Sequence, residues 1–345
     1  MRELYRILDA NFNRAREALR VTEDCGRFAL NDPAITSMAK HMRSDLKGIL
    51  QEMPTSEMLT SRDTAGDIGT ELTSPMESSR EDLGDVAAAA CKRLSEALRT
   101  LEEYSKVVAP QQTVLLERMR YNAYTLEQRL ISRLSLGERF ASVRLYVLVS
   151  AAVCNGSLRE CARAAVAGGA DVLQLREKRP EVSDAQLLAM AAELRELTDE
   201  TSRMLIINDR ADIAAIVGAD GVHLGQTDLP VGEARRLLRP DAIVGKSTHT
   251  IEQARAAVNE GADYIAVGPM FSTGTKDAGP VAGPELLKQA SDEIGIPIVP
   301  IGGISAENVD QLIDAGARRV AVCAAVCAAD SPRKAAEEIR AKFPE

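Results

Sequence analysis

Short runs of β-branched and apolar residues alternate with amphipathic stretches along the chain from about Leu145 onward. Each run is followed by apolar residues at the spacing of a helix. The eight predicted strands cover residues 144–150, 171–178, 204–209, 221–226, 242–247, 263–269, 297–304 and 319–326. Alternation of strand and helix indicates a parallel sheet covered by helices, and eight such units in about 200 residues favour a compact barrel over an open sheet.

The first part of the chain has a different pattern, with long charged helical stretches, no convincing period-two strand and a turn-rich middle. We therefore predict an α/β protein in which an all-α helical domain, residues 1–135, precedes a (β/α)8 TIM barrel, residues 136–345. A helix over 126–142 is expected to lead into the barrel. Within the barrel, two predicted helices open on Ser157 and Ser305, which suit an N-cap.

The helical half contains an internal echo. Six residues recur in order and spacing, Arg14, Glu17, Ala18, Leu19, Arg20 and Glu23 returning as Arg93, Glu96, Ala97, Leu98, Arg99 and Glu102. One interpretation is a pseudo-symmetric pair of helices. The other is two unrelated helices that share EALR, a common helix-forming string. Both stay open at this point.

Composition limits the partners. The formal charge of −9 and the pI near 5.2 argue against a general nucleic-acid or anionic-membrane surface, so an anionic substrate must meet a locally basic pocket. The sequence begins without the apolar segment of a signal peptide and holds no run of about 18 uncharged apolar residues. We expect a cytoplasmic protein without membrane partners; whether it forms a homo-oligomer stays open.

The cysteines and histidines give no motif of their own. The six cysteines include no CxxC pair and have too few histidines nearby for a zinc site, which predicts reduced, mostly buried thiols. His223 lies mid-strand among apolar neighbours, and His249 lies in a loop. We interpret both histidines as structural.

Polar residues mark the end of the second predicted strand. The period-two rule places Leu173 and Leu175 on one face and Gln174, Arg176 and Lys178 on the other, toward the barrel axis. An unpaired cation inside a barrel is costly, so the two basic residues need an anion or a solvated rim. A salt bridge to a carboxylate on a neighbouring strand is the structural alternative.

The next two strand ends supply Asn208, Asp209 and, slightly further on, Asp228. Carboxylates from adjacent strands are suitable ligands for Mg²⁺, which takes substrate phosphates in its remaining positions. Two basic and two acidic groups then describe a metal-bridged diphosphate site. Taken singly, Asp209 could instead cap the following helix, and Asp228 could be a turn residue before Pro230.

Later strand ends offer phosphate-binding features. Ser247 can donate one hydrogen bond to a phosphate oxygen, and the loop 268–283 is rich in Gly, Thr and Ser. Small residues at 301–305 and 323–326 let backbone N–H groups approach a phosphate, the usual phosphate position in this fold. This signal indicates phosphate binding without defining a reaction.

These residues, in this order, resemble the thiamine-phosphate synthase family over roughly the last 200 residues, through QLREK, ND, GVHLGQTD, GKSTHT, GPMFSTGTK and IGGI. The resemblance implies a transferase of thiamine biosynthesis. Such an enzyme joins 4-amino-2-methyl-5-(diphosphooxymethyl)pyrimidine to 4-methyl-5-(2-phosphooxyethyl)thiazole and releases thiamine phosphate and pyrophosphate. It also implies Mg²⁺ held by Asp209 and Asp228, with no nucleophilic side chain.

The resemblance further assigns substrate contacts. The pyrimidine diphosphate would meet Gln174, Leu175, Arg176, Glu177, Lys178 and Asn208, with Ser247 and Lys276 on the diphosphate. The thiazole phosphate would meet Thr273, Gly274, Thr275, Gly303, Cys323 and Ala324. The catalytic residues would be Arg176, Lys178, Ser247 and Lys276, which stabilise the leaving group. Where the family usually shows Ile-Ser, this chain has Cys323-Ala324, so a serine hydroxyl contact would be lost while a backbone contact survives.

The N-terminal half resembles a domain that is fused to some members of this family and likened to a pyrimidine-phosphate kinase. The resemblance rests on YRILDANFNRAREALRVTED and SRDTAGDIGT. It implies that Arg14, Arg20, Arg62 and Asp67 could bind a phosphorylated pyrimidine, whereas a salt-bridged bundle face is the alternative. Two rival functions for the whole chain are a thiazole tautomerase on the same barrel and a non-catalytic sensor of a phosphorylated ligand.

Overall fold

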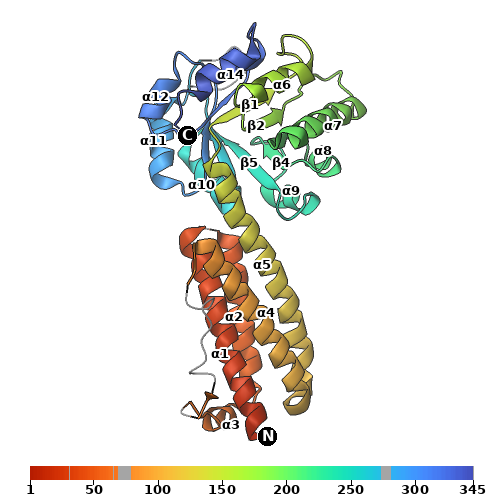
Figure 1. Ribbon diagram of the computed structural model, residues 1–345, viewed down its shortest axis with the longest axis vertical. Coiled ribbons are helices and arrows are strands. Elements are labelled where there is room, and N and C mark those ends of the chain that lie inside the picture. Colours follow the sequence, from red (N-terminus) through yellow and green to blue (C-terminus); the bar gives the residue numbers. More distant parts are fainter. Residues whose placement is uncertain (31, 65, 69–78, 273–280, 345) are drawn as a thin grey trace. The chain divides into compact units, whose positions relative to one another are not determined.

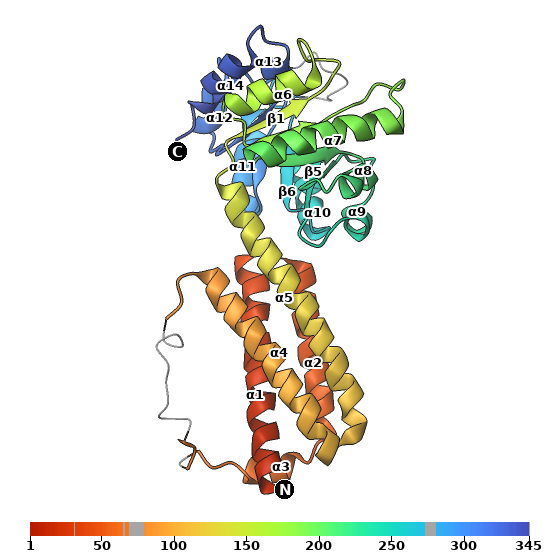
Figure 2. The ribbon, with the colours of Figure 1, turned by 45° about the vertical axis from the view of Figure 1, so that its right-hand side comes forward.

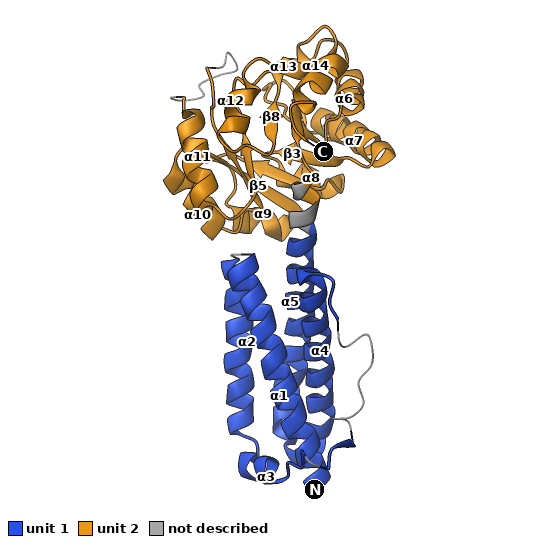
Figure 3. Cartoon of the chain, turned by 60° about the vertical axis from the view of Figure 1, so that its left-hand side comes forward, with its two compact units in different colours: residues 1–135 blue, residues 136–345 orange. Residues whose placement is uncertain are grey.

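The computed structural model describes every residue except 31, 65, 69–78, 273–280 and 345. The chain divides into two compact units, Met1–Ser135 and Leu136–Glu345 (Figure 3). No helix among the described residues is long and apolar enough to cross a membrane. Each unit has its own apolar core.

The first unit is a bundle of long helices, and its described residues contain no strand (Figure 2). Its helices are α1 (Arg2–Asp24), α2 (Pro33–Gln51), α3 (Thr55–Thr60), α4 (Leu83–Val108) and the first part of α5 (Thr113–Ala141), with a π turn at Cys25–Ala29 and a 3-10 turn at Pro110–Gln112. Aspartate side chains cap α2 and α4, because Asp32 accepts from two backbone N–H groups and Asp82 from one. The predicted helix leading into the barrel is confirmed as the end of α5.

The internal echo corresponds to two helices with equivalent ion pairs. Helices α1 and α4 pack against each other, and each carries a buried glutamate at its last echoed position. Each glutamate binds an arginine of its own helix, three residues earlier, and a second arginine on the next long helix. The two clusters are Glu23 with Arg20 and Arg43, and Glu102 with Arg99 and Arg120. The repeated ion pairs favour the pseudo-symmetric interpretation.

The second unit is a barrel of eight parallel strands surrounded by helices, as predicted (Figure 1). The strand order is β7-β6-β5-β4-β3-β2-β1-β8, and a parallel bridge between Ile301 and Ala321 brings the two ends of the sheet together. The strands are β1 (Leu145–Val149), β2 (Val172–Leu175), β3 (Met204–Asn208), β4 (Gly221–Leu224), β5 (Ile243–Thr248), β6 (Tyr264–Val267), β7 (Ile298–Pro300) and β8 (Val320–Val322).

Helices follow the strands around the barrel. They are α6 (Leu158–Ala167), α7 (Asp184–Thr201), α8 (Ala211–Ile216), α9 (Val231–Leu237), α10 (Ile251–Asn259), α11 (Gly283–Glu293), α12 (Val309–Asp314), α13 (Ala324–Cys327) and α14 (Pro332–Arg340). Ser157 caps α6, as predicted. The predicted cap at Ser305 is wrong, because α12 begins only after Asn308. The Asn308 side chain closes a turn before the helix: its Oδ1 accepts from Ser305 N, and its Nδ2 donates to Gly303 O.

The last predicted strand was too long. We expected strand over 319–326, but β8 ends at Val322 and α13 occupies Ala324–Cys327. Apolar residues fill both elements, because Val326 and Cys327 of this helix are buried, and a short apolar run does not distinguish strand from helix.

Side chains on the two faces of the strands pack into two different apolar cores, one between the strands and the helices and one inside the barrel. Leu173 and Leu175 pack with the helices, whereas Tyr146, Ile206 and Tyr264 fill the barrel interior. Phe140 of α5 stacks on Tyr264 inside the barrel, with ring centroids 4.9 Å apart. A Cβ atom on Gly245 would lie 2.1 Å from the Tyr264 ring, so this position needs glycine. The aromatic residues fill the barrel beneath the polar residues at the carboxyl ends of its strands.

Candidate active site at the carboxyl ends of the barrel strands

A cavity of about 310 Å³ lies at the carboxyl ends of the strands. Active sites of this fold are built in the same place, from strand ends and the loops that follow. The structure brings together in its wall many residues that the sequence proposed separately. Among them are Gln174, Arg176, Asn208, Ser247, Gly303, Cys323 and Ala324.

A chain of hydrogen bonds crosses the barrel beneath the cavity. Gln174 Nε2 lies 2.7 Å from Tyr146 Oη, which lies 2.9 Å from Tyr264 Oη. Tyr264 Oη lies 2.9 Å from His223 Nδ1, and His223 Nε2 lies 2.9 Å from Ser247 Oγ. The chain therefore joins side chains of five strands. Sequence reasoning missed it, because tyrosines on β1 and β6 meet only when the sheet closes.

The hydrogen bonds have one consistent direction. Burial lowers the pKa of His223 to about 4, so the ring is neutral near pH 7 and has one donor and one acceptor nitrogen. With the Gln174 amide donating to Tyr146, each tyrosine hydroxyl donates onward and His223 Nδ1 accepts. His223 Nε2–H then donates to Ser247 Oγ, whose own hydrogen is left for a ligand. His223 thus orients Ser247. The interpretation of His223 as a structural residue did not include this role.

Two buried polar atoms beside this chain have no partner among the described residues. They are Gln174 Oε1, an acceptor, and Asn208 Nδ2, a donor. An unsatisfied buried polar group costs about 1–3 kcal/mol. Both side chains line the cavity. A ligand that carries a donor and an acceptor would satisfy both atoms.

A pair of carboxylates lies at the ends of β3 and β4. Burial, and then Asp228, raise the pKa of Asp209. Burial alone would raise the pKa of Asp228, but hydrogen bonds from Asp209 and the Gly225 amide lower it. Lys178 pairs with Asp209. Two interacting carboxyl groups beside a cation, at a polar rim, fit the hard oxygen ligands of Mg²⁺.

The structure excludes the interpretation of Asp209 as a helix cap. Asp209 has a φ of 62°, in the left-handed region that is uncommon outside glycine and asparagine. Its side chain does not cap the following helix, because α8 has Arg210 at the N-cap and no side-chain cap. Such conformations concentrate at functional sites. Asp228 closes its own loop by accepting from Gly225 N at 2.6 Å.

The basic residues of the second strand end have different surroundings. Arg176 lines the cavity and forms no ion pair with the described residues, whereas Lys178 forms the salt bridge to a neighbouring-strand carboxylate that the structural alternative expects. Glu177 binds Arg179, and Leu175 packs against the helices, so neither side chain is among the cavity lining.

The other end of the cavity is formed by small residues. Gly303 has a φ of 67°, and a Cβ atom there would lie 2.6 Å from Ser272 O, so no larger residue fits without displacement. Cys323 and Ala324 line the cavity at the start of α13. His249, also in the lining, lies 2.6 Å from Gly268 O through Nδ1. Four proposed contacts, Thr273, Gly274, Thr275 and Lys276, lie outside the described residues.

The helical unit has a cavity of its own, of about 1000 Å³, between α1, α2 and α3. Its described lining contains five cations and one carboxylate, Asp9; the cations are Arg16, Lys40, Arg43, Lys47 and Arg62. Of the residues that the sequence proposed for this unit, Arg62 lies in the wall and binds Asp9 at 2.6 and 2.8 Å. Arg20 pairs with Glu23 and Asp24, and Arg14 and Asp67 are not among the described lining.

Residues 145–326 match the family model described as thiamine monophosphate synthase, and residues 6–129 match the ThiD2 family. A thiamine-phosphate synthase of Nostoc sp. is 40% identical, over 95% of this chain and 91% of the relative. One of Synechocystis sp. is 39% identical, over 97% of this chain and 94% of the relative. A solved structure, the thiamine phosphate pyrophosphorylase from Pyrococcus furiosus, is 34% identical with a TM-score of 0.54, covering 59% of this chain and 96% of that one.

Proposed function

The chain belongs to the thiamine-phosphate synthase family and is a transferase of that type, and we propose that its barrel cavity is where the pyrimidine and thiazole substrates are joined. The family membership covers both units, because the Nostoc and Synechocystis relatives match nearly the whole chain.

The observation that carries the proposal is the pair of unsatisfied atoms in the cavity wall. An aminopyrimidine presents an amino donor next to a ring-nitrogen acceptor. Gln174 Oε1 is a free acceptor and Asn208 Nδ2 a free donor among the described residues. Binding the aminopyrimidine would satisfy both atoms and remove the cost of leaving them unbonded.

The diphosphate group would then lie over the carboxyl ends of β2 to β5. Arg176 has no competing ion pair among the described residues, and Lys178 can exchange its contact with Asp209 for a phosphate oxygen. Ser247 has a hydroxyl hydrogen available because His223 donates to its oxygen. These donors would stabilise the charge that develops on departing pyrophosphate. Lys276 is proposed for the same role from the family resemblance alone.

Asp209 and Asp228 are the residues that fit Mg²⁺. Their carboxyl groups interact with each other, and they flank the proposed position of the diphosphate. When bound, Mg²⁺ would neutralise charge on the diphosphate oxygens. Apart from this charge, the chain's own residues bind and orient both substrates.

The reaction needs no nucleophilic side chain. The bond between the pyrimidine methylene carbon and the diphosphate oxygen breaks, the aminopyrimidine delocalises the positive charge, and the thiazole nitrogen forms the new bond to carbon. Gly303 and the backbone at Cys323-Ala324 would hold the thiazole phosphate at the opposite side of the cavity. Catalysis would therefore depend on positioning and on electrostatic stabilisation.

The test is product formation by the full chain. The protein is mixed with both substrates and Mg²⁺, and thiamine phosphate and pyrophosphate are measured by chromatography. Equal amounts of the two products, dependent on both substrates and lost with a chelator, would support the proposal. Pyrophosphate release without the thiazole, or undiminished synthesis in the chelator, would contradict the coupled reaction and the metal dependence respectively.

A second function is favoured by the cavity of the helical unit. Its described lining has five cations and one carboxylate in a chain whose net charge is −9; Arg43 pairs with Glu23 and Arg62 with Asp9, and the other three cations leave the lining locally basic. Apolar side chains, including Phe12 and Met58, complete the wall. This combination suits a flat apolar ring that carries a phosphate. We assign the unit the binding of a phosphorylated pyrimidine, as its resemblance to a kinase domain suggested.

Calorimetry with the pyrimidine monophosphate tests this second function on the full chain. Binding should persist when the barrel is saturated with pyrophosphate and Mg²⁺, because the two cavities belong to different units. Complete competition would place the ligand in the barrel instead.

A further inference from the structure

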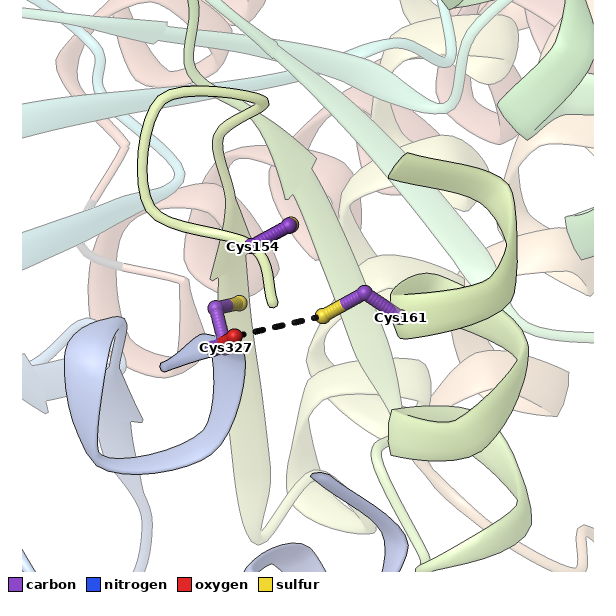
Figure 4. Close-up of side chains that lie close together, drawn as sticks. All are labelled: Cys154, Cys161 and Cys327. Carbon is purple, nitrogen blue, oxygen red and sulfur yellow. Dashed lines mark hydrogen bonds between the residues drawn. The ribbon is translucent and has the colours of Figure 1, made fainter. Parts of the chain in front are cut away.

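Three cysteines that lie far apart in the sequence meet beside the barrel (Figure 4). Cys154 belongs to the loop after β1, Cys161 to α6, and Cys327 is the last residue of α13. Their sulfur atoms all lie within 4.8 Å of one another. Spacing alone did not indicate this site, because the three residues form no motif.

The backbone holds the three residues in place. Asn155 N donates to Cys327 O at 2.9 Å and so ties the loop to α13. Cys327 Sγ lies 3.2 Å from Leu148 O, and Cys161 Sγ lies 3.9 Å from Cys327 O. These thiol contacts are weak and can be given up when the sulfur atoms acquire a stronger partner.

The arrangement suits a metal ion better than a disulfide. A zinc–sulfur bond of about 2.3 Å places the sulfur atoms of a tetrahedral centre roughly 3.8 Å apart, a small adjustment from the observed cluster. A disulfide would join two of the sulfurs at about 2.05 Å and leave the third without a role. Cys161 and Cys327 are buried, whereas Cys154 is partly exposed and leaves access from solvent.

We propose that Cys154, Cys161 and Cys327 form a three-thiolate site for a soft metal ion, with Zn²⁺ as the expected occupant and water as its fourth ligand. On binding, three S–H bonds break, three metal–sulfur bonds form, and three protons pass to solvent. The ligand set is all sulfur, which selects against the hard Mg²⁺ proposed for Asp209 and Asp228. The three cysteines are not in the described lining of the substrate cavity, although that lining includes Cys323, whose side chain contacts Cys327.

A metal at this site would join three elements of the barrel. It would fasten the loop after β1 and α6 to the end of α13, a helix whose first residue, Ala324, lines the substrate cavity. The ion would therefore stabilise the part of the barrel behind the proposed thiazole-phosphate position. This role needs no change in the reaction itself.

The test uses Co²⁺ as a coloured substitute for Zn²⁺. The full chain is kept reduced with a phosphine, and its six thiols are confirmed by titration in denaturant. The intense sulfur-to-cobalt charge-transfer absorption of thiolate ligands should then saturate at one Co²⁺ per chain, and Zn²⁺ should abolish this absorption by displacement. The absorption of wild-type protein tests the proposal without any variant.

Cys154→Ser removes the accessible ligand and should weaken Co²⁺ binding at least about tenfold, since even indirect ligand contacts are worth that much. Cys91→Ser, at a buried cysteine of the helical unit, is the matched control and should bind as wild type does. If Cys154→Ser does not fold by circular dichroism, Cys154→Ala replaces it. Absence of the absorption in fully reduced wild-type protein would overturn the proposal and leave the cysteines as apolar packing. Equal binding by folded Cys154→Ser would also overturn it.

Discussion

The two cavities differ in how their polar groups are held. In the barrel, Gln174 is 2% exposed and is fixed by a hydrogen bond to Tyr146, at one end of a chain that reaches Ser247. In the helical unit, the side chain of Arg62 is 49% exposed, and its only described ion pair is with Asp9. Buried, fixed groups discriminate between ligands by their hydrogen bonds, whereas exposed cations attract any anion of suitable size.

This difference predicts how substitutions act. Changes at the barrel site should have large and specific effects on turnover or stability, because the groups are buried and interdependent. Changes at the basic cavity should have small effects that salt diminishes, because water and ions screen exposed charges. The helical unit also has buried polar groups, Glu23 and Glu102. Their ion pairs join neighbouring helices and therefore stabilise the fold.

The largest effect is expected from Asp209→Asn. Asparagine tolerates the left-handed backbone at this position, so the fold should persist while one carboxylate charge is lost. Synthesis should fall about 10³-fold, the scale of removing one group that stabilises developing charge. Steady-state product formation gives the value. Asp212→Asn, at a carboxylate paired with Arg210 on the protein surface, is the control and should retain activity. Wild-type turnover in Asp209→Asn would remove this residue from the mechanism.

Glu102→Gln and Glu23→Gln should act on stability and leave synthesis unchanged. Each removes the buried carboxylate of an ion-pair cluster and should destabilise the helical unit by about 2 kcal/mol. The effect should be greater for Glu102, because the side chain of Arg120 is only 11% exposed and that of Arg43 is 35% exposed. Denaturant unfolding followed by circular dichroism measures both, with the exposed Glu117→Gln as control. Equal, negligible shifts would show that the clusters do not support the bundle.

Tyr264→Phe should interrupt the hydrogen-bond chain of the barrel. The loss leaves Tyr146 and His223 Nδ1 without their shared partner and should cost about 1.5 kcal/mol of unfolding free energy. The transition of the barrel should shift in denaturant and that of the helical unit should not. Tyr121→Phe removes a hydroxyl from a residue that is 57% exposed and should shift neither transition. An unchanged barrel transition in Tyr264→Phe would show that the chain adds no stability.

The smallest effect is expected from Lys47→Gln, in the wall of the basic cavity. Binding of the pyrimidine monophosphate should weaken about twofold to threefold, as for one exposed charge, and the difference should vanish at high salt. Calorimetry at two salt concentrations measures it. Lys92→Gln, at a lysine outside the cavity that pairs with Glu127, should bind normally. A loss of synthesis in Lys47→Gln would contradict the separation of the two cavities.

The barrel could be predicted because its signals are local. Period-two patterning of the second strand predicts Gln174 inward and Leu175 outward, and both orientations are confirmed. Strand ends were less accurate, since an apolar run such as 319–326 continues from strand into helix without a change of composition. The start of α12 was also predicted wrongly. Both Ser305 and Asn308 suit the start of a helix, and the turn between them, which delays the helix to Asn308, cannot be recognised from composition.

The site could be predicted only in part. Polar residues at successive strand ends indicated where the cavity would lie. The tyrosine and histidine chain could not be predicted, because Tyr146 and Tyr264 are 118 positions apart and meet only through closure of the barrel. The cysteine cluster could not be predicted for the same reason, because the sequence indicates only reduced, mostly buried thiols at Cys154, Cys161 and Cys327.

The central proposal is that the barrel recognises the aminopyrimidine through the free atoms of Gln174 and Asn208. Calorimetry with the pyrimidine diphosphate and with an analogue that has hydrogen in place of the 4-amino group tests it most directly. The analogue should bind wild-type protein about tenfold or more weakly, because Gln174 Oε1 would stay buried without a donor. In Gln174→Leu the two ligands should bind alike. Equal affinities for wild-type protein would contradict the account.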